Sequence, residues 1–277
     1  MARTIAVASQ KGGVAKTTTV VNLAASLAVL KYRTVAVDLD PQNAVGYGLG
    51  LSREDMNEGI YDVLNNRKAL TDVILPTSLK LLKVIPCGRA PYRSEERQET
   101  MISAAEDMRK FLQEKHQSVL TRLRQYMEAV AKSCDYLLID CPPGIGEMTI
   151  YALASADSVL IPMQCEPLSM KTLTQILRVI RRIRKTLNPK LVIEGILITM
   201  YDEGYRIARE VYNQILATFP QEIVFRTVIP RMEEFTTVFA TGRPVILQYP
   251  DSEIATAYLN LARELTLKYR KAVEEES

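Results

Sequence analysis

Short apolar runs alternate with longer amphipathic stretches along the chain. The runs are rich in β-branched residues and end in turn residues, which predicts strands at Thr4–Ala8, Thr34–Leu39, Leu79–Ile85, Tyr136–Ile139, Ser158–Met163, Leu191–Thr199 and Phe225–Ile229. Helical spacing between them predicts helices at Thr17–Leu30, Thr172–Thr186, Ile207–Ala217 and Glu253–Val273. This alternation is typical of parallel βαβ units covered on both faces. We therefore predict one α/β domain over residues 1–277, with a mostly parallel twisted sheet flanked by helices.

One stretch departs from this alternation. Residues Ser94–Lys132 have the spacing of a long helix, and the apolar positions of its C-terminal half are typical of a helix that packs on the core. The N-terminal half is more polar. We interpret Ser94–Ser118 as a helical insertion that either contacts a partner or forms a solvated arm.

The composition is that of a soluble globular protein. Of 277 residues, 47% are hydrophobic and 24% are charged, which excludes extended disorder, collagen and a disulfide scaffold. A net charge of +3 allows a local basic face without establishing nucleic-acid binding. Four scattered cysteines without a CxxC pair indicate reduced thiols, and the single histidine, His116, argues against a histidine-based zinc site.

The N-terminus lacks the apolar run of a signal peptide, and no window approaches the ~20 apolar residues that span a bilayer. We therefore expect a cytoplasmic protein without a membrane partner. The glycine-rich loop begins almost at residue 1, so we also expect no preceding helix-turn-helix domain and no sequence-specific repressor function.

The glycine-rich segment Ser9–Thr18 follows the first predicted strand and opens the first predicted helix. Small residues let backbone N–H groups turn toward phosphate oxygens, and a helix N-terminus favours anions. Lys16 is placed to reach the β- and γ-phosphates and Thr17 to bind Mg²⁺. The strict pattern GxxxxGK[ST] is not met, because Gln10 and Ala15 stand at its glycine positions. The predicted nucleotide-binding residues of this loop are Lys11, Gly12, Gly13, Val14, Ala15, Lys16, Thr17 and Thr18.

Three aspartates follow two apolar strands. Asp38 and Asp40 end the second predicted strand and share one of its faces, and Asp140 ends another. Carboxyl ends of parallel strands are where open α/β sheets bind ligands. We predict that Thr17, Asp40 and Asp140 handle Mg²⁺ and its water, and that Asp40 orients the attacking water in phosphoryl transfer.

Together these motifs resemble the ParA/Soj family of deviant Walker A ATPases. The resemblance covers nearly the whole chain outside the insertion, and it rests on KGGVAKT at Lys11–Thr17, DLDPQ at Asp38–Gln42, IDCPP at Ile139–Pro143, IPMQCEP at Ile161–Pro167, GILITMYD at Gly195–Asp202, TVIPR at Thr227–Arg231, GRPVILQYP at Gly242–Pro250 and AYLNLARE at Ala257–Glu264.

The resemblance implies slow, partner-stimulated ATP hydrolysis with Mg²⁺ in a homodimer that holds both nucleotides between its subunits. Lys11 would cross the interface to the partner's phosphates and act with Lys16 and Asp40 in catalysis. Glu166 would reach nucleotide or Lys11 across the same interface. The residues bordering adenine would be Met200, Pro230, Arg231 and Met232.

The predicted helix Thr172–Thr186 carries a basic face opposite its apolar stripe. Such a face is commonly just solvated, but the resemblance implies non-specific DNA binding by the ATP-bound dimer. The candidate DNA contacts are Arg178, Arg181, Arg182, Arg184, Lys185, Arg206, Arg231 and Arg243. The sequence departs from the family pattern in two places. Glu203–Arg206 replaces the family's ARTN-like run, which concerns the DNA contacts, and the DPQN segment that begins at Asp40 lacks the glycine that usually follows DPQ.

We therefore predict a nucleoid-associated ATPase that segregates a chromosome, plasmid or other cargo and responds to a ParB-like or cargo-adaptor partner. One alternative is a MinD-like membrane ATPase, although the tail ends in Glu274–Glu276, which anionic lipid repels. A second is a metabolic ATPase or iron–sulfur reductase on the same scaffold, for which Cys141 is a candidate. A third, a nucleotide-gated scaffold without turnover, is disfavoured by the presence of both Lys11 and Asp40.

Overall fold

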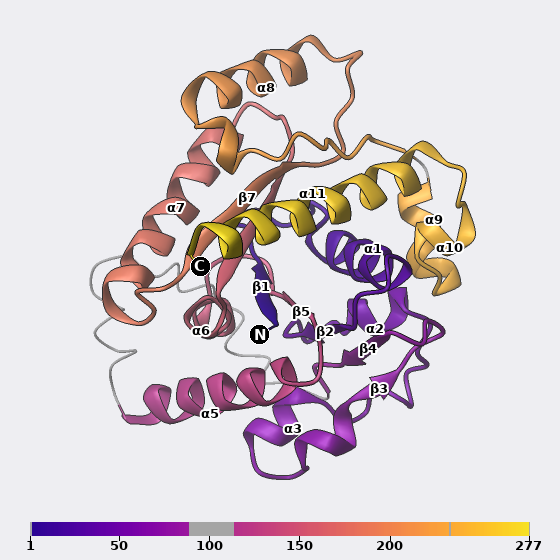
Figure 1. Ribbon diagram of the computed structural model, residues 1–277, viewed down its shortest axis with the longest axis vertical. Helices are drawn as coiled ribbons and strands as arrows, with labels where there is room; N and C mark the ends of the chain where they lie inside the picture. Colours follow the sequence, from indigo (N-terminus) through magenta and orange to yellow (C-terminus); the bar gives the residue numbers. More distant parts are fainter. Residues whose placement is uncertain (1, 89–113, 233, 277) are drawn as a thin grey trace.

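A computed structural model describes residues 2–88, 114–232 and 234–276 (Figure 1). In this part of the chain one seven-stranded sheet has the order β3-β4-β2-β5-β1-β6-β7. All neighbouring strands are parallel except β3 and β4. The strands are β1 (Arg3–Val7), β2 (Thr34–Asp38), β3 (Leu75–Pro76), β4 (Leu82–Ile85), β5 (Tyr136–Asp140), β6 (Ser158–Met163) and β7 (Val192–Ile198).

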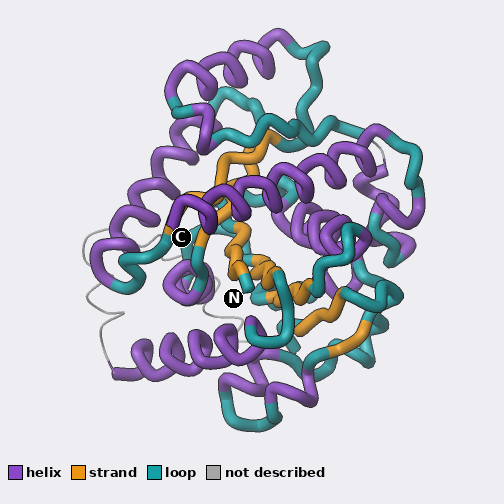
Figure 2. The backbone as a smooth tube through the Cα atoms, viewed as in Figure 1, coloured by secondary structure: helices purple, strands orange, loops and turns teal. Residues whose placement is uncertain are grey.

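Helices cover both faces of this sheet, as Figure 2 shows. On one face lie α3 (Ile60–Leu64), α5 (Glu114–Ala131), α6 (Glu147–Ser155), α7 (Ser169–Thr186) and α8 (Arg206–Thr218). On the other lie α1 (Lys16–Val29), α2 (Ala44–Gly48), α9 (Glu234–Thr241), α10 (Val245–Gln248) and α11 (Glu253–Glu276). Two short 3-10 turns, η1 (Leu70–Val73) and η2 (Gln221–Ile223), complete the described elements.

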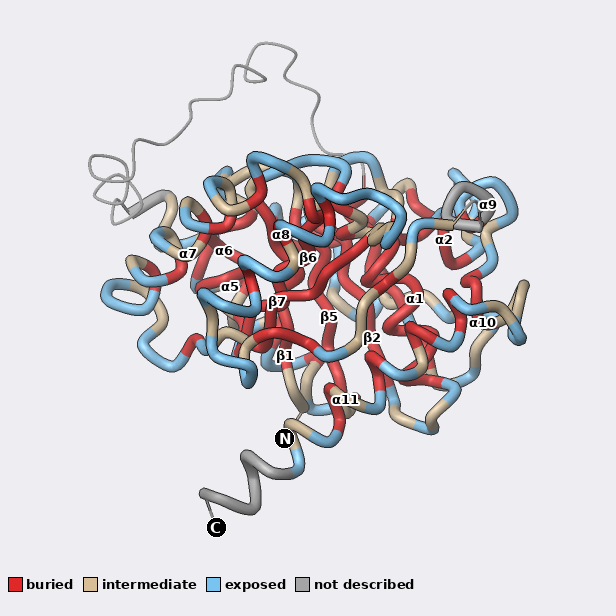
Figure 3. The backbone as a smooth tube through the Cα atoms, turned by 90° about the horizontal axis from the view of Figure 1, so that it is seen from above, coloured by how far each residue is buried: buried red, intermediate tan, exposed pale blue. Residues whose placement is uncertain are grey.

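The strands alternate between the two cores, as the period of two requires. In β1, Ala6 packs toward the α5–α6–α7 face, whereas Ile5 and Val7 pack toward α1 and α11. Apart from the half-buried Arg3, the central strands β1, β2, β5 and β6 are buried, and the exposed segments are outer helices and loops (Figure 3). The predicted fold class is therefore confirmed, and the apolar strand runs arise from burial on both faces.

One predicted strand was wrong. Phe225–Ile229 is an extended segment rather than a strand. The N–H groups of Phe225 and Ile229 donate to the carbonyl oxygens of Ile196 and Ile198 in β7, and the Phe225 ring packs over Gly195. The intervening N–H groups of Arg226 and Thr227 donate instead to the Glu264 carboxylate of α11, at 2.8 and 3.0 Å. In a parallel ladder Thr227 N would be the next donor toward β7 after Phe225 N, and because Glu264 accepts it the pairing is interrupted.

The seventh strand of the sheet is β3, which the apolar pattern missed. It has two residues, and one of them is Pro76, so it carries no detectable alternation. The predicted strand Leu79–Ile85 is shortened to β4. Of the predicted insertion Ser94–Ser118, residues 94–113 lie outside the described residues, and Glu114–Ser118 form the first turn of α5.

Candidate nucleotide site

The glycine-rich loop joins the carboxyl end of β1 to the first turn of α1. Two of its residues have positive φ, Gly13 at 72° and Ala15 at 61°. The buried Val14 between them packs into the protein and holds the loop against the sheet. This strand–loop–helix arrangement directs the N-terminus of α1 toward the space above the sheet, where an anion is favoured.

Three side chains bind the loop's carbonyl oxygens, one from Ser9 at the start of the segment and two from distant parts of the chain. The Ser9 hydroxyl donates to Lys11 O at 2.8 Å, Gln164 Nε2 donates to Gly13 O at 3.2 Å, and the Thr199 hydroxyl donates to Val14 O at 3.1 Å. With carbonyls bonded into the protein, the loop can present N–H groups outward as an anion nest. The motifs in the sequence did not indicate the supporting roles of these residues. Gln164 and Thr199 follow β6 and β7, a position shared with the predicted aspartates.

Lys16 is buried at the base of the loop. Its ammonium donates to Ser9 Oγ at 3.2 Å and to Lys11 O at 3.4 Å. Burial lowers the pKa of Lys16, and the nearby Asp140 partly opposes that shift. A desolvated cation bonded only to neutral oxygens gains a favourable interaction when phosphate oxygens approach it.

Asp140 and Thr17 provide the oxygen atoms expected for Mg²⁺. The Thr17 hydroxyl donates to Asp140 Oδ2 at 2.6 Å, while the buried Oδ1 has no hydrogen-bond partner among the described residues. Burial raises the pKa of Asp140, and burial together with repulsion from Asp140 also raises the pKa of Asp38. A hard oxygen-seeking cation would satisfy the orphaned carboxylate oxygen, so this donor set fits Mg²⁺ completed by phosphate and water.

Asp40 lies on the turn that follows β2, half-buried beside this pair. Its N–H donates to Asp38 Oδ1 at 2.8 Å, and its own Oδ1 accepts from Gln42 N at 2.9 Å. Asp38 also accepts from Val45 N at 3.0 Å. The structure thus assigns different surroundings to the two aspartates: Asp38 is fully buried and organises the turn, whereas Asp40 is accessible to a ligand.

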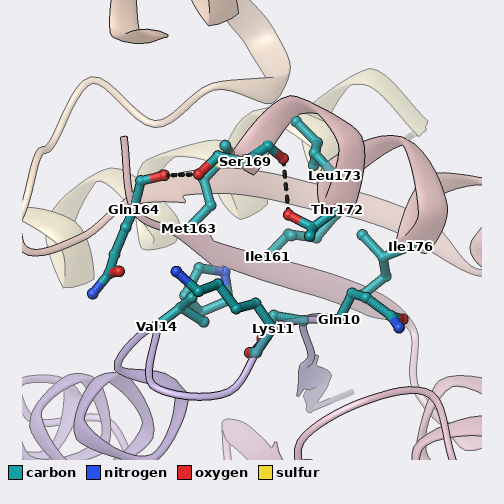
Figure 4. A pocket seen from close by; sticks show the side chains of 12 residues that line it. Gln10, Lys11, Val14, Ile161, Met163, Gln164, Ser169, Thr172, Leu173 and Ile176 are labelled. Atoms are coloured by element: carbon teal, nitrogen blue, oxygen red, sulfur yellow. Dashed lines mark hydrogen bonds between the residues drawn. The ribbon is translucent and has the colours of Figure 1, made fainter. Parts of the chain in front are cut away.

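Lys11 and Glu166 form an ion pair within the same chain. Both side chains are partly exposed, at 44% and 40%. We expected each to act across a subunit interface, and in the single subunit they contact each other instead. Glu166 lies in the turn that leads into α7, and Leu168, which is 69% exposed, follows it. A cavity of about 20 Å³ separates the loop from the first turns of α7, lined by residues that include Gln10, Thr172 and Ile176 (Figure 4).

The residues predicted to border adenine come from two adjacent segments. Met200 has a left-handed conformation, with φ 49°, and its sulfur accepts from Gln164 Nε2 at 3.3 Å. Pro230 forms an isolated bridge with Tyr201, and Arg231 N donates to Tyr201 O at 2.8 Å. Met232 packs against the α1–α11 core. The structure therefore brings Met200 and Pro230–Met232 together on the loops that follow β7 and the extended segment.

The predicted DNA contacts do not form one surface in a single subunit. Arg178, Arg181, Arg184 and Lys185 are exposed along the C-terminal half of α7, and Arg182 is half-buried. Arg206 pairs with Glu210 at 3.1 Å at the start of α8, which packs against α7. Arg243 precedes α10, on the opposite side of the molecule from α7 in Figure 1. Arg184 and Lys185 also stabilise the negative end of the α7 dipole, which alone would account for them.

The four cysteines are buried at separate places. Burial raises the pKa of Cys134 to about 11 and that of Cys165 to about 12. Such thiols behave as small apolar side chains. Within the described residues, no helix combines the length and hydropathy needed to cross a membrane.

Comparisons with known proteins place this site in context. A family model described as "AAA domain" matches residues 2–193. The chromosome partitioning protein ParA of Myxococcus xanthus is 39% identical over 263 residues, covering 95% of this chain and 87% of the relative. The sporulation initiation inhibitor protein Soj of Bacillus subtilis is 38% identical over 265 residues, covering 96% and 98%.

Solved structures share the fold. A cobyrinic acid a,c-diamide synthase from Mycobacterium smegmatis with bound ADP and magnesium has a TM-score of 0.76 at 27% identity, covering 98% of this chain and 97% of its own. The cell division ATPase MinD of Pyrococcus furiosus has a TM-score of 0.74 at 23% identity, covering 96% and 99%.

Proposed function

This chain belongs to the ParA/Soj family of ATPases, and from that premise we propose that it moves or positions a cargo along DNA through an ATP-driven cycle. The chain is an ATPase with the fold of the MinD-type enzymes and a partitioning role. One observation carries this proposal. Around the glycine-rich loop lie the buried Lys16, an Asp140 oxygen without a hydrogen-bond partner among the described residues, and the accessible Asp40.

We assign the chemical roles as follows. The loop N–H groups and Lys16 would hold the phosphates of ATP, and Thr17 with Asp140 would hold Mg²⁺, which would neutralise phosphate charge. Asp40 orients the attacking water. Lys11 leaves Glu166 when a second subunit approaches and contacts that subunit's nucleotide, so ATP binding favours the dimer. The exposed Leu168 beside this ion pair supports an interface on the same face.

In this proposal dimerisation creates the DNA-binding surface. Each subunit contributes the basic half of α7, and two copies double the number of cations that can contact phosphates. Arg206 opens α8 and Arg231 follows the Tyr201–Pro230 bridge, so both come after the carboxyl end of β7 and would add cations apart from the basic half of α7, which leads back to the amino end of that strand. Such contacts are independent of sequence and weaken steeply with salt. A ParB-like or cargo-adaptor partner then stimulates hydrolysis and releases the subunits from the nucleoid.

The metabolic alternative has one observation in its favour, the similarity to a synthase structure at 27% identity. The partition proteins are more similar in sequence, at 38–39% over at least 87% of their length. The membrane alternative rests on the fold alone, since the MinD structure is 23% identical. The partition reading therefore has the stronger support.

The test is binding to non-specific duplex DNA with ATP, ADP and no nucleotide across a salt series. We expect binding with ATP only, and a triple variant Arg181→Ala, Arg184→Ala, Lys185→Ala should lower the salt slope by about 0.9 per lost phosphate contact. The matched control is Arg53→Ala, Lys80→Ala, Lys83→Ala, which removes the same charge from exposed positions elsewhere. If DNA affinity and salt slope fell equally in both variants, the effect would be one of net charge. If the unsubstituted protein bound no DNA with ATP, with ADP or without nucleotide, the proposal would be overturned.

A further inference from the structure

Asn43 occupies an unusual place in the turn between Asp40 and α2. It precedes Ala44, the first residue of α2, where an asparagine side chain commonly caps the helix. Here the side chain makes no capping bond. The backbone of Asn43 has φ 52°, a left-handed conformation that asparagine tolerates better than most residues, and its N–H donates to Asp40 O at 3.0 Å.

The Asn43 side chain instead binds a different loop, 44 residues further along the chain. Its Oδ1 accepts from Cys87 N at 2.7 Å and from Gly88 N at 3.3 Å, and its Nδ2 donates to Gly88 O at 3.0 Å. The amide thus pairs with the loop backbone as a neighbouring strand would. These bonds lie at a buried place, since Cys87 and Gly88 are both buried.

The loop that Asn43 binds is rigidly anchored. It follows β4, and the first turn of α3 donates to it from Ile60 N to Pro86 O at 2.9 Å and from Tyr61 N to Cys87 O at 3.1 Å. Gly59 packs so closely that a Cβ there would lie 2.2 Å from Pro86 O. A loop with so little free space cannot shift easily, which makes it a fixed reference point for whatever binds it.

The turn that carries Asp40 is therefore held at two sites. At the end of β2, the buried Asp38 carboxylate accepts the N–H groups of Asp40 and Val45. From the side, the Asn43 amide joins the turn to the Cys87–Gly88 backbone. We propose that Asn43 is a positioning residue for ATP hydrolysis, which holds the Asp40 turn in the geometry that the water-orienting step requires. This inference rests on the proposed role of Asp40.

The variant Asn43→Gly isolates the side chain, because glycine adopts the same positive φ without strain. It removes three hydrogen bonds of the amide and leaves the nucleotide loop intact. We expect kcat for ATP to fall about tenfold, because these bonds order a catalytic group. We expect ATP affinity and KM to change by less than about twofold. Asn43→Asp, which keeps the acceptor and loses the donor, should fall between Asn43→Gly and the unsubstituted chain.

The matched control is Asn66→Gly. Asn66 also has a positive φ, at 57°, but it is exposed in the turn after α3. It should leave kcat unchanged. Wild-type kcat in Asn43→Gly, or parallel losses of ATP affinity and kcat, would overturn the proposal. Asp40→Ala measured alongside separates the two claims. If it keeps turnover, the role of Asp40 fails and this inference with it. If it is inactive while Asn43→Gly is fully active, only this inference fails.

Discussion

At the scale of single residues, the informative position is Ala15. An alanine with φ 61° is strained by roughly 1–2 kcal/mol, because its Cβ approaches the neighbouring carbonyl. The loop accepts this strain because the conformation directs Val14 into the core and opens α1 at Lys16. The strict nucleotide-loop pattern has glycine here, and glycine would adopt this conformation without the strain.

Replacing Ala15 with glycine should therefore stabilise the protein. Relief of strain is opposed by the greater freedom of glycine in the unfolded chain, roughly 0.5–1 kcal/mol. We expect a net gain of up to about 1 kcal/mol in the free energy of unfolding, measured by urea denaturation. Lys31→Gly serves as a positive control. Lys31 has φ 72° just after the C-terminus of α1, so relief of the same kind of strain should stabilise this variant as well. A loss of stability in Ala15→Gly would show that the alanine is not strained.

At the scale of elements, α11 holds the segment that leads to the residues predicted to border adenine. Glu264 accepts Arg226 N, Thr227 N and the Thr227 hydroxyl at 2.8–3.0 Å, which holds the extended segment that leads to Pro230. Lys268, one turn further, donates to Glu194 O and Glu222 O and lies 4.4 Å from the Phe225 ring centroid. A segment outside the sheet ladder therefore depends on a helix for its position.

Glu264→Ala should loosen this segment. Three bonds to a carboxylate are lost, and water can replace part of them because Arg226 is exposed, so we expect about 1–2 kcal/mol of destabilisation. ATP affinity should fall as well if Pro230–Met232 border adenine, which equilibrium binding of a fluorescent ATP analogue measures. Arg263→Ala, the exposed neighbour, should change stability by less than about 0.5 kcal/mol. Unchanged affinity in Glu264→Ala would separate the segment from the nucleotide.

At the scale of the whole molecule, the proposed dimer requires that one face of the subunit meet the same face of a second copy. The Lys11–Glu166 pair and the exposed Leu168 lie on the nucleotide side, whereas the exposed Leu267 lies on α11 next to Lys268. The Lys268 ammonium reaches β7 at Glu194, toward the amino end of that strand. The two leucines thus lie at opposite ends of the sheet. Each is more than half exposed, so Leu267 is a suitable control position for Leu168.

We expect Leu168→Asp to prevent the ATP-dependent dimer, since it places a charge at the proposed interface. The same change suits the folded monomer, because aspartate is a favourable N-cap residue for α7. Sedimentation velocity with ATP should show monomer for Leu168→Asp and dimer for Leu267→Asp. A dimer in both variants would place the interface elsewhere.

Local pattern was sufficient for most of the fold and for the position of the glycine-rich loop between the first strand and the first helix. The central strands and the long helices follow from periodicity. A strand buried on both faces is apolar at nearly every position, and a helix buried on one face is apolar at every third or fourth position. The loop and its aspartates were found because each follows an apolar strand, and parallel strands bring their carboxyl ends to one edge. The short edge strand β3 left no periodic signal, and Phe225–Ile229 has strand-like composition without a strand partner.

Contacts between distant segments depended on the folded arrangement. Asn43 meets Gly88, Gln164 meets Gly13, and Lys11 meets Glu166, and nothing in the spacing of these residues indicates that they touch. Such pairings are set by where neighbouring strands end and how tightly the loops pack there. The sequence pattern indicates which residues are buried, because each buried position by itself favours an apolar side chain. Partner choice was settled by three-dimensional packing, because it depends on which chain segments share the same edge of the sheet.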